Sequence, residues 1–189
     1  MIDPFADIQA ATRAHRKKHG CGAYTFENGP ELLQLAAALQ PKRVLELGTA
    51  LGYTACCLAQ GSPRAQVDTV EMDEDHVALA REQIAKHGLS DRICVHPGAF
   101  EQVLPVLVPG FDLIFFDGFA PTPGVIRRLR ELLMQGGVLV CSNLQLAKAI
   151  DAHALGIDLD DPDRWQAMPA LEGGRTRVCR KHAPDQRTP

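Results

Sequence analysis

Short apolar runs alternate with amphipathic stretches along most of this chain. Leu32, Ala36 and Leu39 recur at helical spacing and form one apolar face. Residues 113–116 are instead a continuous apolar run, as is typical of a parallel strand that is buried on both faces. The pattern therefore predicts an alternation of strands and helices.

Turn-forming residues divide these stretches into separate elements. We expect strands at residues 43–47, 66–71, 93–96, 113–116 and 138–141. We expect helices at residues 3–18, between Pro30 and Pro41, through Cys56 and Leu58, and at residues 73–87, 101–108, 125–134 and 146–155. In the first helix, Asp3 is the expected N-cap and Pro4 the expected first helical residue.

The C-terminal part of the chain has a hairpin pattern. Residues 165–171 and 175–180 flank Glu172-Gly173-Gly174, which favours a tight turn between antiparallel strands. Strand–helix–strand units that end in a hairpin predict an α/β fold, Rossmann-like and doubly wound. Its sheet would be mostly parallel, with helices on both faces and a C-terminal antiparallel β-hairpin. We expect a single domain over residues 1–189, in which residues 1–40 add N-terminal helices to a core of residues 41–189.

The composition is that of an ordinary globular domain. Of 189 residues, 46% are hydrophobic and 23% are charged, which suffices for a packed core. The formal net charge of -3 disfavours a nucleic-acid partner, because such proteins usually carry a basic surplus. A basic cluster at residues 13–19 has two interpretations, a nucleic-acid contact or the solvated, cationic end of a helix. We favour the second.

Two further features indicate a cytoplasmic protein with reduced thiols. No apolar run reaches the roughly 18 residues of a membrane span, and the N-terminus does not resemble an export signal. The six cysteines form no C-x-x-C pair and no zinc-finger spacing, and most lie in apolar stretches such as Ile93-Cys94-Val95. We therefore expect buried, unpaired thiols and no membrane partner.

The most informative segment is the turn after the first expected strand. Gly48 and Gly52 stand four residues apart, which allows a ligand to approach the backbone closely. The following helix would offer its N-terminal N–H groups to a carboxylate, and Glu46 could accept a hydrogen bond from an ammonium group. An amino-acid moiety would satisfy both ends of this segment.

Acidic residues also end later strands, at the sheet edge where ligands of parallel α/β sheets bind. Glu71 ends the second strand, where a carboxylate can accept hydrogen bonds from both hydroxyls of a ribose, and Asp117 ends the fourth. A nicotinamide enzyme would share the acid at Glu71. Its G-x-G-x-x-G motif is absent, however, because Ala50 and Tyr53 occupy two of the glycine positions.

In these segments the chain resembles the class I S-adenosylmethionine (AdoMet)-dependent methyltransferases. Within that class it resembles the small O-methyltransferases of the catechol and caffeoyl-CoA O-methyltransferase type, over about residues 25–181. The segments that carry the resemblance are Val44-Leu45-Glu46-Leu47-Gly48, Gly52-Tyr53-Thr54, Val70-Glu71-Met72-Asp73, Gly98-Ala99, Phe111-Asp112-Leu113-Ile114-Phe115-Phe116-Asp117, Gly136-Gly137-Val138-Leu139-Val140 and the terminal hairpin.

The resemblance implies how individual residues hold AdoMet. Gly48 and Gly52 would flank the methionine part, Thr54 would reach its carboxylate, and Glu71 would hold the ribose. Further cofactor-binding positions that the resemblance implies are Glu46, Ala50, Tyr53, Met72, Ala99, Phe100 and Asp117. Met72 would pack on the adenine, and Ala99 and Phe100 would line the adenine slot. For Met72 and Phe100 the alternative is an ordinary position in the core.

The sequence departs from this family where the catechol enzymes bind a divalent cation. In those enzymes an Asp after the fourth strand and an Asp-Asn pair after the fifth strand hold the ion, with a catalytic lysine nearby. Here Asp117 and Asn143 match the outer ligands, but Ser142 replaces the middle Asp and Ala120 replaces the lysine. Because hard cations need several anionic oxygens, we expect divalent metal binding to be weak or absent.

Asp117 remains the candidate catalytic residue. Its alternative role is that of a strand-end acid bonded to backbone N–H groups. A histidine could replace the missing lysine as a base, but a lone histidine is more often a surface or hydrogen-bonded residue. We therefore assign no catalytic role to His76, His96 or His153.

The sequence thus predicts an enzyme, an AdoMet-dependent methyltransferase that methylates a hydroxyl oxygen of a small molecule. One alternative is methylation of a nitrogen or of a macromolecule, although Asp117-Gly118-Phe119-Ala120 occupies the place of the tetrapeptide typical of amino-group methylation. Another alternative, motivated by Ser142 and Ala120, is a protein that binds AdoMet without catalysis. The methyl acceptor stays open. The oligomeric state also stays open, since members of the family often form homodimers.

Overall fold

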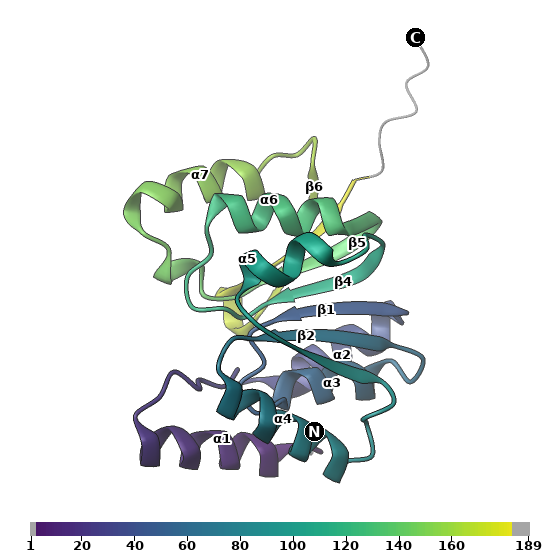
Figure 1. Cartoon of the computed structure of the whole chain (residues 1–189). Helices are drawn as coiled ribbons and strands as arrows, with labels where there is room; N and C mark the ends of the chain where they lie inside the picture. The colour runs from purple at the N-terminus through teal and green to yellow at the C-terminus, as the bar shows by residue number, and fades with distance from the viewer. Residues whose placement is uncertain (1–2, 183–189) are drawn as a thin grey trace. The chain divides into compact units, whose positions relative to one another are not determined.

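The computed structural model describes residues 3–182, and the chain divides into two compact units. The first unit ends at Val106 and the second begins at Leu107. In Figure 1 the first unit runs from purple to teal and the second from green to yellow.

Three parallel strands form the centre of the first unit. They are β1 (Arg43–Leu47), β2 (Gln66–Glu71) and β3 (Ile93–Pro97), and β2 lies between the other two. The register places Glu46 of β1 opposite Thr69 of β2. Because all three strands are parallel, their carboxyl ends lie at one edge of this part of the sheet.

Helices connect these strands and cover them (Figure 1). Their bounds are α2 (Gly29–Leu39) before β1, α3 (Tyr53–Gly61) between β1 and β2, α4 (Glu74–Lys86) between β2 and β3, and α5 (Phe100–Val103) after β3, which continues into a 3-10 turn at Leu104–Val106. Helix α3 packs against α2 and β2, and α4 packs against β2 and β3. The predicted strands at 43–47 and 66–71 are confirmed to the residue.

Helix α3 is buried on almost every side. Eight of its nine residues are buried, so it lacks the polar face of an ordinary surface helix. A glycine at its last position permits the close approach of α2. A Cβ atom at Gly61 would lie 2.3 Å from the carbonyl oxygen of Leu33 and 2.8 Å from Cβ of Ala36.

The N-terminal helix α1 (Ala6–His19) lies antiparallel to α4. At one end, the carboxylate of Asp7 lies 3.0 Å from Nζ of Lys86 and 3.1 Å from Nε2 of His87. At the other end, the rings of His15 and His76 meet edge to face. Figure 1 shows the two helices side by side.

The start of α1 differs from the prediction. Asp3 is not the N-cap, because the helix begins at Ala6 after Phe5. Oδ1 of Asp3 instead accepts a hydrogen bond from the Phe5 N–H at 2.9 Å, and its Oδ2 accepts one from the hydroxyl of Tyr53 at 2.5 Å. The helix ends at His19, one residue beyond the expected end at Lys18, and Gly20 closes it at φ 65°.

The second unit contains four strands. They are β4 (Phe111–Phe116), β5 (Leu133–Cys141), β6 (Trp165–Leu171) and β7 (Thr176–Lys181), in the order β4-β5-β7-β6. Strands β4 and β5 are parallel, whereas β7 is antiparallel to both β5 and β6. The predicted C-terminal hairpin is therefore confirmed. Helix α6 (Pro123–Leu132) packs on β5, and α7 (Ala149–Leu159) packs on α6.

Strand β5 is longer than the sequence pattern predicts. It begins at Leu133 instead of residue 138, so Gly136 and Gly137 lie within the strand. Gly136 has a φ of 74°, and the pairing of β4 with β5 shifts register between Phe111 and Leu113. A glycine pair in a strand is typical of such an irregularity. The expected helix at 125–134 is wrong at its end, because Leu133 and Met134 belong to β5.

The six cysteines are all free thiols, as predicted. Four of them are buried, and Cys21 is partly exposed. The prediction of a buried thiol is wrong for Cys94. This residue is exposed because side chains of β3 alternate between the packed face and solvent.

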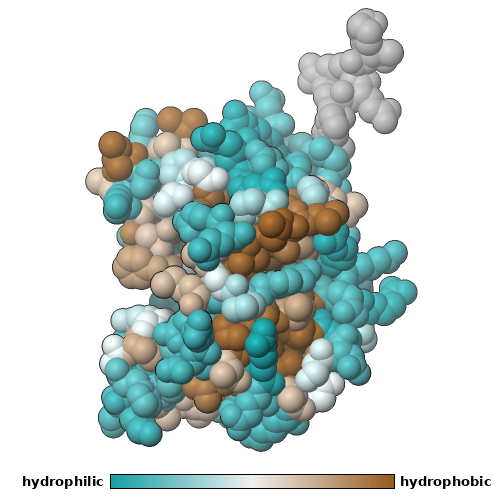
Figure 2. Space-filling view, viewed as in Figure 1, coloured by the Kyte–Doolittle hydropathy of each residue, from teal (hydrophilic) through white to brown (hydrophobic). Residues whose placement is uncertain are grey.

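Within residues 3–182, no helix is long and apolar enough to cross a membrane. The surface over α1 is mostly hydrophilic in Figure 2. The basic residues of this helix are exposed, which agrees with a solvated helix end; they are Arg13, Arg16, Lys17 and Lys18.

Candidate functional site

The glycine turn between β1 and α3 has a left-handed backbone at three positions. Gly48 has a φ of 95°, Ala50 of 46° and Gly52 of 91°. Glycine adopts such angles without strain, whereas a left-handed residue with a Cβ costs about 1–2 kcal/mol. The strained angle at Ala50 is held by a hydrogen bond, because its N–H donates to Oε2 of Glu71 at 2.9 Å.

The turn opens onto an uncapped helix N-terminus. Gly52 is the N-cap of α3 and supplies no side chain for capping. The first N–H groups of a helix have no partner within the helix, and they carry its positive dipole end. This end of α3 can therefore receive a carboxylate, as the sequence predicts.

Two residues predicted from the start of α3 are buried side chains. Thr54 is 4% exposed and Tyr53 is 3% exposed. The Tyr53 hydroxyl points to Asp3, and a Cβ atom at Gly29 would lie 2.3 Å from it. Burial and the Asp3 carboxylate raise the pKa of Tyr53 far above its ordinary value. The Tyr53 side chain thus anchors the N-terminal segment, and only its backbone lies at the turn.

A buried hydrogen-bond chain supports Glu46. The hydroxyl of Thr69 donates to Oε2 of Glu46 at 2.6 Å. The hydroxyl oxygens of Thr69 and Thr49 are 2.5 Å apart. Since Thr69 gives its proton to the carboxylate, Thr49 donates to Thr69. Sequence reasoning missed both threonines, whose only signal is the register of Thr69 opposite Glu46.

Glu71 lies at the carboxyl end of β2 with both carboxylate oxygens engaged by backbone. Its Oε2 accepts from Ala50 and its Oε1 accepts from the N–H of Asp73 at 3.0 Å. The side chain is 11% exposed. Each carboxylate oxygen has a second lone pair, so the group can still accept from ligand hydroxyls. Glu71 therefore joins the glycine turn to the start of α4.

The residues predicted for an adenine slot are not core residues. Met72 is 75% exposed, so the alternative reading of Met72 as core is wrong. Ala99 and Phe100 are both partly exposed at the start of α5. The N–H of Ala99 donates to Oε1 of Gln102 at 3.1 Å, which fixes this turn after β3.

In the second unit, a polar cluster follows β4 and β5. Asn143, with a φ of 60°, donates from Nδ2 to Oδ1 of Asp117 at 3.1 Å and to the carbonyl oxygen of Gly118 at 3.0 Å. The side chain of Ser142 also hydrogen-bonds to Asp117. The structure thus brings the three predicted positions together. The side chains of Asn143 and Ser142 donate hydrogen bonds to the Asp117 carboxylate, a role that the sequence analysis had given to backbone N–H groups.

The electrostatics of Asp117 are dominated by burial. Burial raises the pKa of Asp117 to about 7, the charge of Glu172 adds to this rise, and the hydrogen bonds from Ser142 and Asn143 oppose it. Sequence reasoning missed Glu172, which it treated only as part of a turn. Its carboxylate accepts a hydrogen bond from Thr176 at 2.7 Å.

This cluster does not fit a tightly held hard dication. Asp117 is the only carboxylate among the three aligned positions, and Asn143 turns an amide N–H toward it instead of an oxygen toward a shared point. Such ions are held by converging oxygens, usually from one or two carboxylates with additional waters.

Of the three histidines considered as bases, two have no contact with the candidate cofactor residues or with Asp117 among the interactions described. His96 is held by Asp68, with 2.7 Å between Nε2 and Oδ1. His153 is exposed on α7. His76 is different, because it is buried and its Nδ1 lies 3.9 Å from Oε1 of Glu71.

The chain matches the model of one protein family, described as a methyltransferase domain, over residues 45–144. It is 35% identical over 153 residues to a catechol O-methyltransferase of Mycobacterium tuberculosis, a match that covers 79% of this chain and 67% of that protein. It is 31% identical over 151 residues to catechol O-methyltransferase B of Danio rerio, covering 75% of this chain and 57% of that protein.

Solved structures show the same fold. The O-methyltransferase TomG from Streptomyces achromogenes, in complex with SAM, has a TM-score of 0.81 at 20% identity and covers 94% of this chain and 90% of its own. An O-methyltransferase from Bacillus cereus in complex with SAH has a TM-score of 0.77 at 20% identity, covering 97% and 92%. The predicted fold class, a Rossmann-like, mostly parallel sheet with a C-terminal hairpin, is confirmed.

Proposed function

The chain belongs to the class I AdoMet-dependent O-methyltransferases, and from this premise we propose that it methylates a phenolic hydroxyl of a small aromatic molecule. The acceptor class is supported by the relatives from Mycobacterium tuberculosis, Niastella koreensis and Danio rerio, all of which are catechol O-methyltransferases. The observation that carries the cofactor assignment is the joint position of Glu46, the glycine turn and Glu71 in the first unit.

The donor groups of the first unit fit the separate parts of AdoMet. The N-terminus of α3 suits the carboxylate of the amino-acid part, and Glu46 supplies the negative charge for its ammonium group. Glu71 suits the ribose hydroxyls, because a charged acceptor makes strong hydrogen bonds to both. The exposed thioether of Met72, with Ala99 and Phe100, offers the apolar surface that an adenine ring needs.

Bound AdoMet supplies a methyl group that is already activated by its positively charged sulfur. The remaining task of the protein is to hold the acceptor oxygen in line and to help remove its proton. We assign proton removal to Asp117, whose buried carboxyl has a pKa raised to about 7. A base of that pKa is partly ionised at neutral pH and accepts a proton readily.

Two alternatives are weaker. Methylation of a nitrogen or of a macromolecule finds no support in the relatives named above. A non-catalytic AdoMet-binding protein would follow from the differences at Ser142 and Ala120, and turnover distinguishes it. We also place the protein in the reducing cytoplasm with no nucleic-acid partner, because all six thiols are free and the net charge is -3.

Calorimetry and a turnover assay test the proposal together. We expect AdoMet and S-adenosylhomocysteine to bind and NAD to show no binding, and we expect mass spectrometry to find a monomethylated product from catechol or a related phenol. Tighter binding of NAD than of AdoMet would contradict the cofactor assignment. AdoMet binding without turnover on a broad phenol, amine and peptide panel would favour the non-catalytic alternative.

A further inference from the structure

Three metal-ligating side chains of the first unit converge outside the cofactor residues. They come from α1 (His15), from the segment directly after α1 (Cys21) and from the first turn of α4 (His76). One ring nitrogen of each histidine and the sulfur of Cys21 all lie within 4.8 Å of one another. The sequence gives no zinc-finger spacing, because Cys21 and His76 are far apart along the chain.

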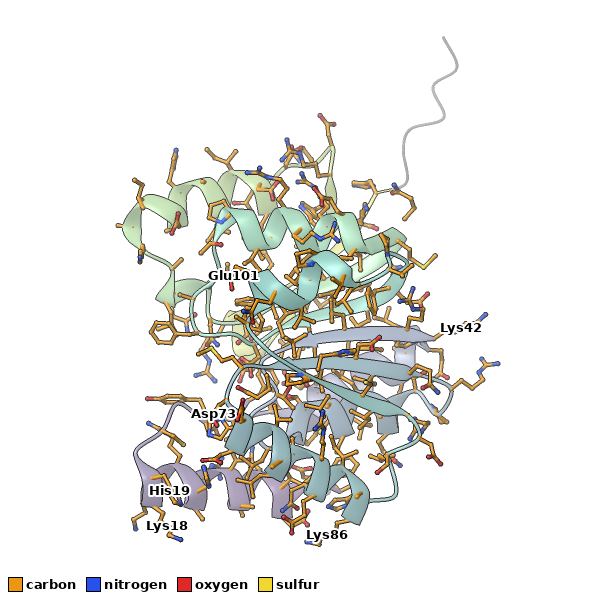
Figure 3. The ribbon with its side chains drawn as sticks, viewed as in Figure 1. Lys18, His19, Lys42, Asp73, Lys86 and Glu101 are labelled. Atoms are coloured by element: carbon orange, nitrogen blue, oxygen red, sulfur yellow. The ribbon has the colours of Figure 1, made fainter. Side chains whose placement is uncertain are left out.

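The packing of α1 against α4 brings the three residues together. Gly20 turns the chain in the left-handed conformation directly after α1, which returns Cys21 toward His15. The rings of His15 and His76 are 5.3 Å apart at an interplanar angle of 78°. Figure 3 shows this region, with His19 labelled at the end of α1 and Asp73 at the start of α4 on the same side of the first unit.

His76 carries the observation that points to a ligand. The residue is 5% exposed, and its Nε2 is buried without a hydrogen-bond partner among the described residues. A buried polar atom without a partner costs about 1–3 kcal/mol, so such atoms in folded proteins usually have a partner that completes them. The other ring nitrogen, Nδ1, faces Oε1 of Glu71 at 3.9 Å.

A ligating histidine generally directs its second nitrogen to a carboxylate, which fixes the ring orientation and raises its basicity. The Glu71 carboxylate lies on the Nδ1 side of the His76 ring at 3.9 Å, beyond hydrogen-bond distance, and Nε2 is the nitrogen without a partner among the described residues.

We propose that His15, Cys21 and His76 form a structural site for Zn²⁺ or a similar thiophilic divalent ion. Two imidazoles and a thiolate are the ligands that zinc prefers over magnesium or calcium. A tetrahedral ion with bonds of about 2.0–2.3 Å holds its ligand atoms about 3.4–3.6 Å apart, which side-chain rotations can reach from separations that are all within 4.8 Å. With three protein ligands the fourth position of the tetrahedron is open to a water molecule, as in zinc sites that are not closed by a fourth side chain.

An ion can reach this site from the surface. A hollow of 370 Å³ opens beside the thiol and is lined by Arg13, Arg16, Lys17, Gly20, Cys21 and Tyr24. Within this hollow the guanidinium of Arg16 stacks on the ring of Tyr24 at 3.6 Å, and Arg13 forms an ion pair with Glu27 at 2.6 Å, which offsets the charge of Arg13.

A second cluster in the first unit is less suited to an ion. Asp68, Cys94 and His96 also lie within 4.8 Å of one another, but Nε2 of His96 already hydrogen-bonds to Asp68 at 2.7 Å. No buried atom of this cluster lacks a partner among residues 3–182. Cys94 in this second cluster therefore provides a control substitution for the zinc-binding experiment.

The test uses the full chain, treated with chelator and reductant and then titrated with ZnCl₂ in a calorimeter. We expect one zinc ion per chain, and Co²⁺ should give a thiolate-to-metal charge-transfer band. Cys21→Ser and His15→Ala should each weaken zinc binding at least about 10- to 100-fold, the cost of losing even an outer-shell partner, and Cys21→Ser should abolish the band. Cys94→Ser and His153→Ala should bind zinc like the wild type.

A measurement on the unmodified protein keeps the proposal testable if a variant does not fold. Zinc should slow alkylation of Cys21 by iodoacetamide and leave alkylation of the exposed Cys94 unchanged, as peptide mass spectrometry resolves. Equal zinc binding by wild type and Cys21→Ser, loss of binding only in Cys94→Ser, or absence of zinc binding by the wild type would each overturn the proposal. These outcomes are independent of AdoMet binding and turnover.

Discussion

At the scale of single residues, Glu71 has three neighbours in two segments, the glycine turn and the start of α4. It accepts from the backbone of the glycine turn and of α4, and it faces the ring of His76. A residue with these contacts contributes both to a ligand site and to the local fold. Substituting it should therefore change two measurable quantities.

We expect Glu71→Ala to lower AdoMet affinity at least about tenfold, because charge-assisted hydrogen bonds to the ribose are worth about 1.5–3 kcal/mol each. The free energy of unfolding should also fall, since the N–H groups of Ala50 and Asp73 lose their acceptor. Calorimetry measures the first quantity and urea unfolding the second. Glu74→Ala removes an exposed acid of the same type three positions away and should change neither. Unchanged affinity in Glu71→Ala would mean that the ribose is held elsewhere.

Asp117 gives a prediction about pH. Its pKa rises from an ordinary 3.8 to about 7 on folding, so between these values the folded protein holds a proton that the unfolded chain has lost. This contribution to stability is fully present below 3.8 and is lost as the pH rises through about 7. Asp117→Asn cannot titrate. The free energy of unfolding of the wild type should therefore fall relative to Asp117→Asn by up to about 1.4 kcal/mol per pH unit across this window.

Urea unfolding at several pH values between about 4.5 and 7.5 tests the difference between the two proteins. The exposed Asp91 provides the control, since Asp91→Asn should leave the pH dependence of the wild type intact. Parallel pH profiles of wild type and Asp117→Asn would show that the acid titrates alike in the folded and unfolded chain.

At the scale of elements, α2 packs closely against α3. This packing depends on the missing side chain of Gly61, whose Cβ would clash with backbone of α2. We expect Gly61→Ala to destabilise the protein by about 1–3 kcal/mol, the usual cost of overpacking. Gly156→Ala is the matched control, because a Cβ in α7 meets no atom within 4 Å. That substitution should be neutral or stabilising by about 0.5–1 kcal/mol. Thermal unfolding measures the stability change in both variants. Equal destabilisation by Gly61→Ala and Gly156→Ala would refute the packing argument.

The elements themselves were largely predictable, for a physical reason. Buried parallel strands and strand-end glycines leave local patterns, so 43–47, 66–71 and the turn between Gly48 and Gly52 follow from the sequence. The start of β5 at Leu133 does not, because the pairing of Leu133 with Phe111 of β4 extends the strand through glycines that favour a turn locally. Long-range partnership overrode local preference there.

At the scale of the whole molecule, the candidate site was predictable only where the motif is local. The residues around Gly48 and Glu71 stand in recognisable segments. Glu172 near Asp117, Asp3 on Tyr53 and the cluster of His15, Cys21 and His76 join segments that are far apart in the chain. No spacing rule connects such residues before the fold is known.

The whole enzyme should not require a tightly bound magnesium-like ion. Asp117 is the one carboxylate of its cluster that aligns with a metal ligand, and its neighbours donate hydrogen bonds to it. We expect methyl transfer to persist after EDTA treatment and to change little on addition of Mg²⁺, Mn²⁺ or Ca²⁺.

Zinc must be varied separately in this assay, because EDTA also strips the site at Cys21. Cys21→Ser, assayed with and without EDTA, isolates the effect at Asp117. Activity that chelation abolishes in this variant and that Mg²⁺ restores would show that the Ser142 replacement leaves a working metal centre.

The two backbone hydrogen bonds to Glu71 lower the entropy that this side chain loses when a ligand binds. A flexible acid loses about 0.5–1.5 kcal/mol of rotamer entropy when a ligand immobilises it. The carboxylate of Glu71 is already fixed by two N–H groups before any ligand arrives, so little of that entropy remains to be lost. The acid is preorganised, and the free energy of its contacts with a ribose is available for affinity instead of being consumed in ordering the side chain.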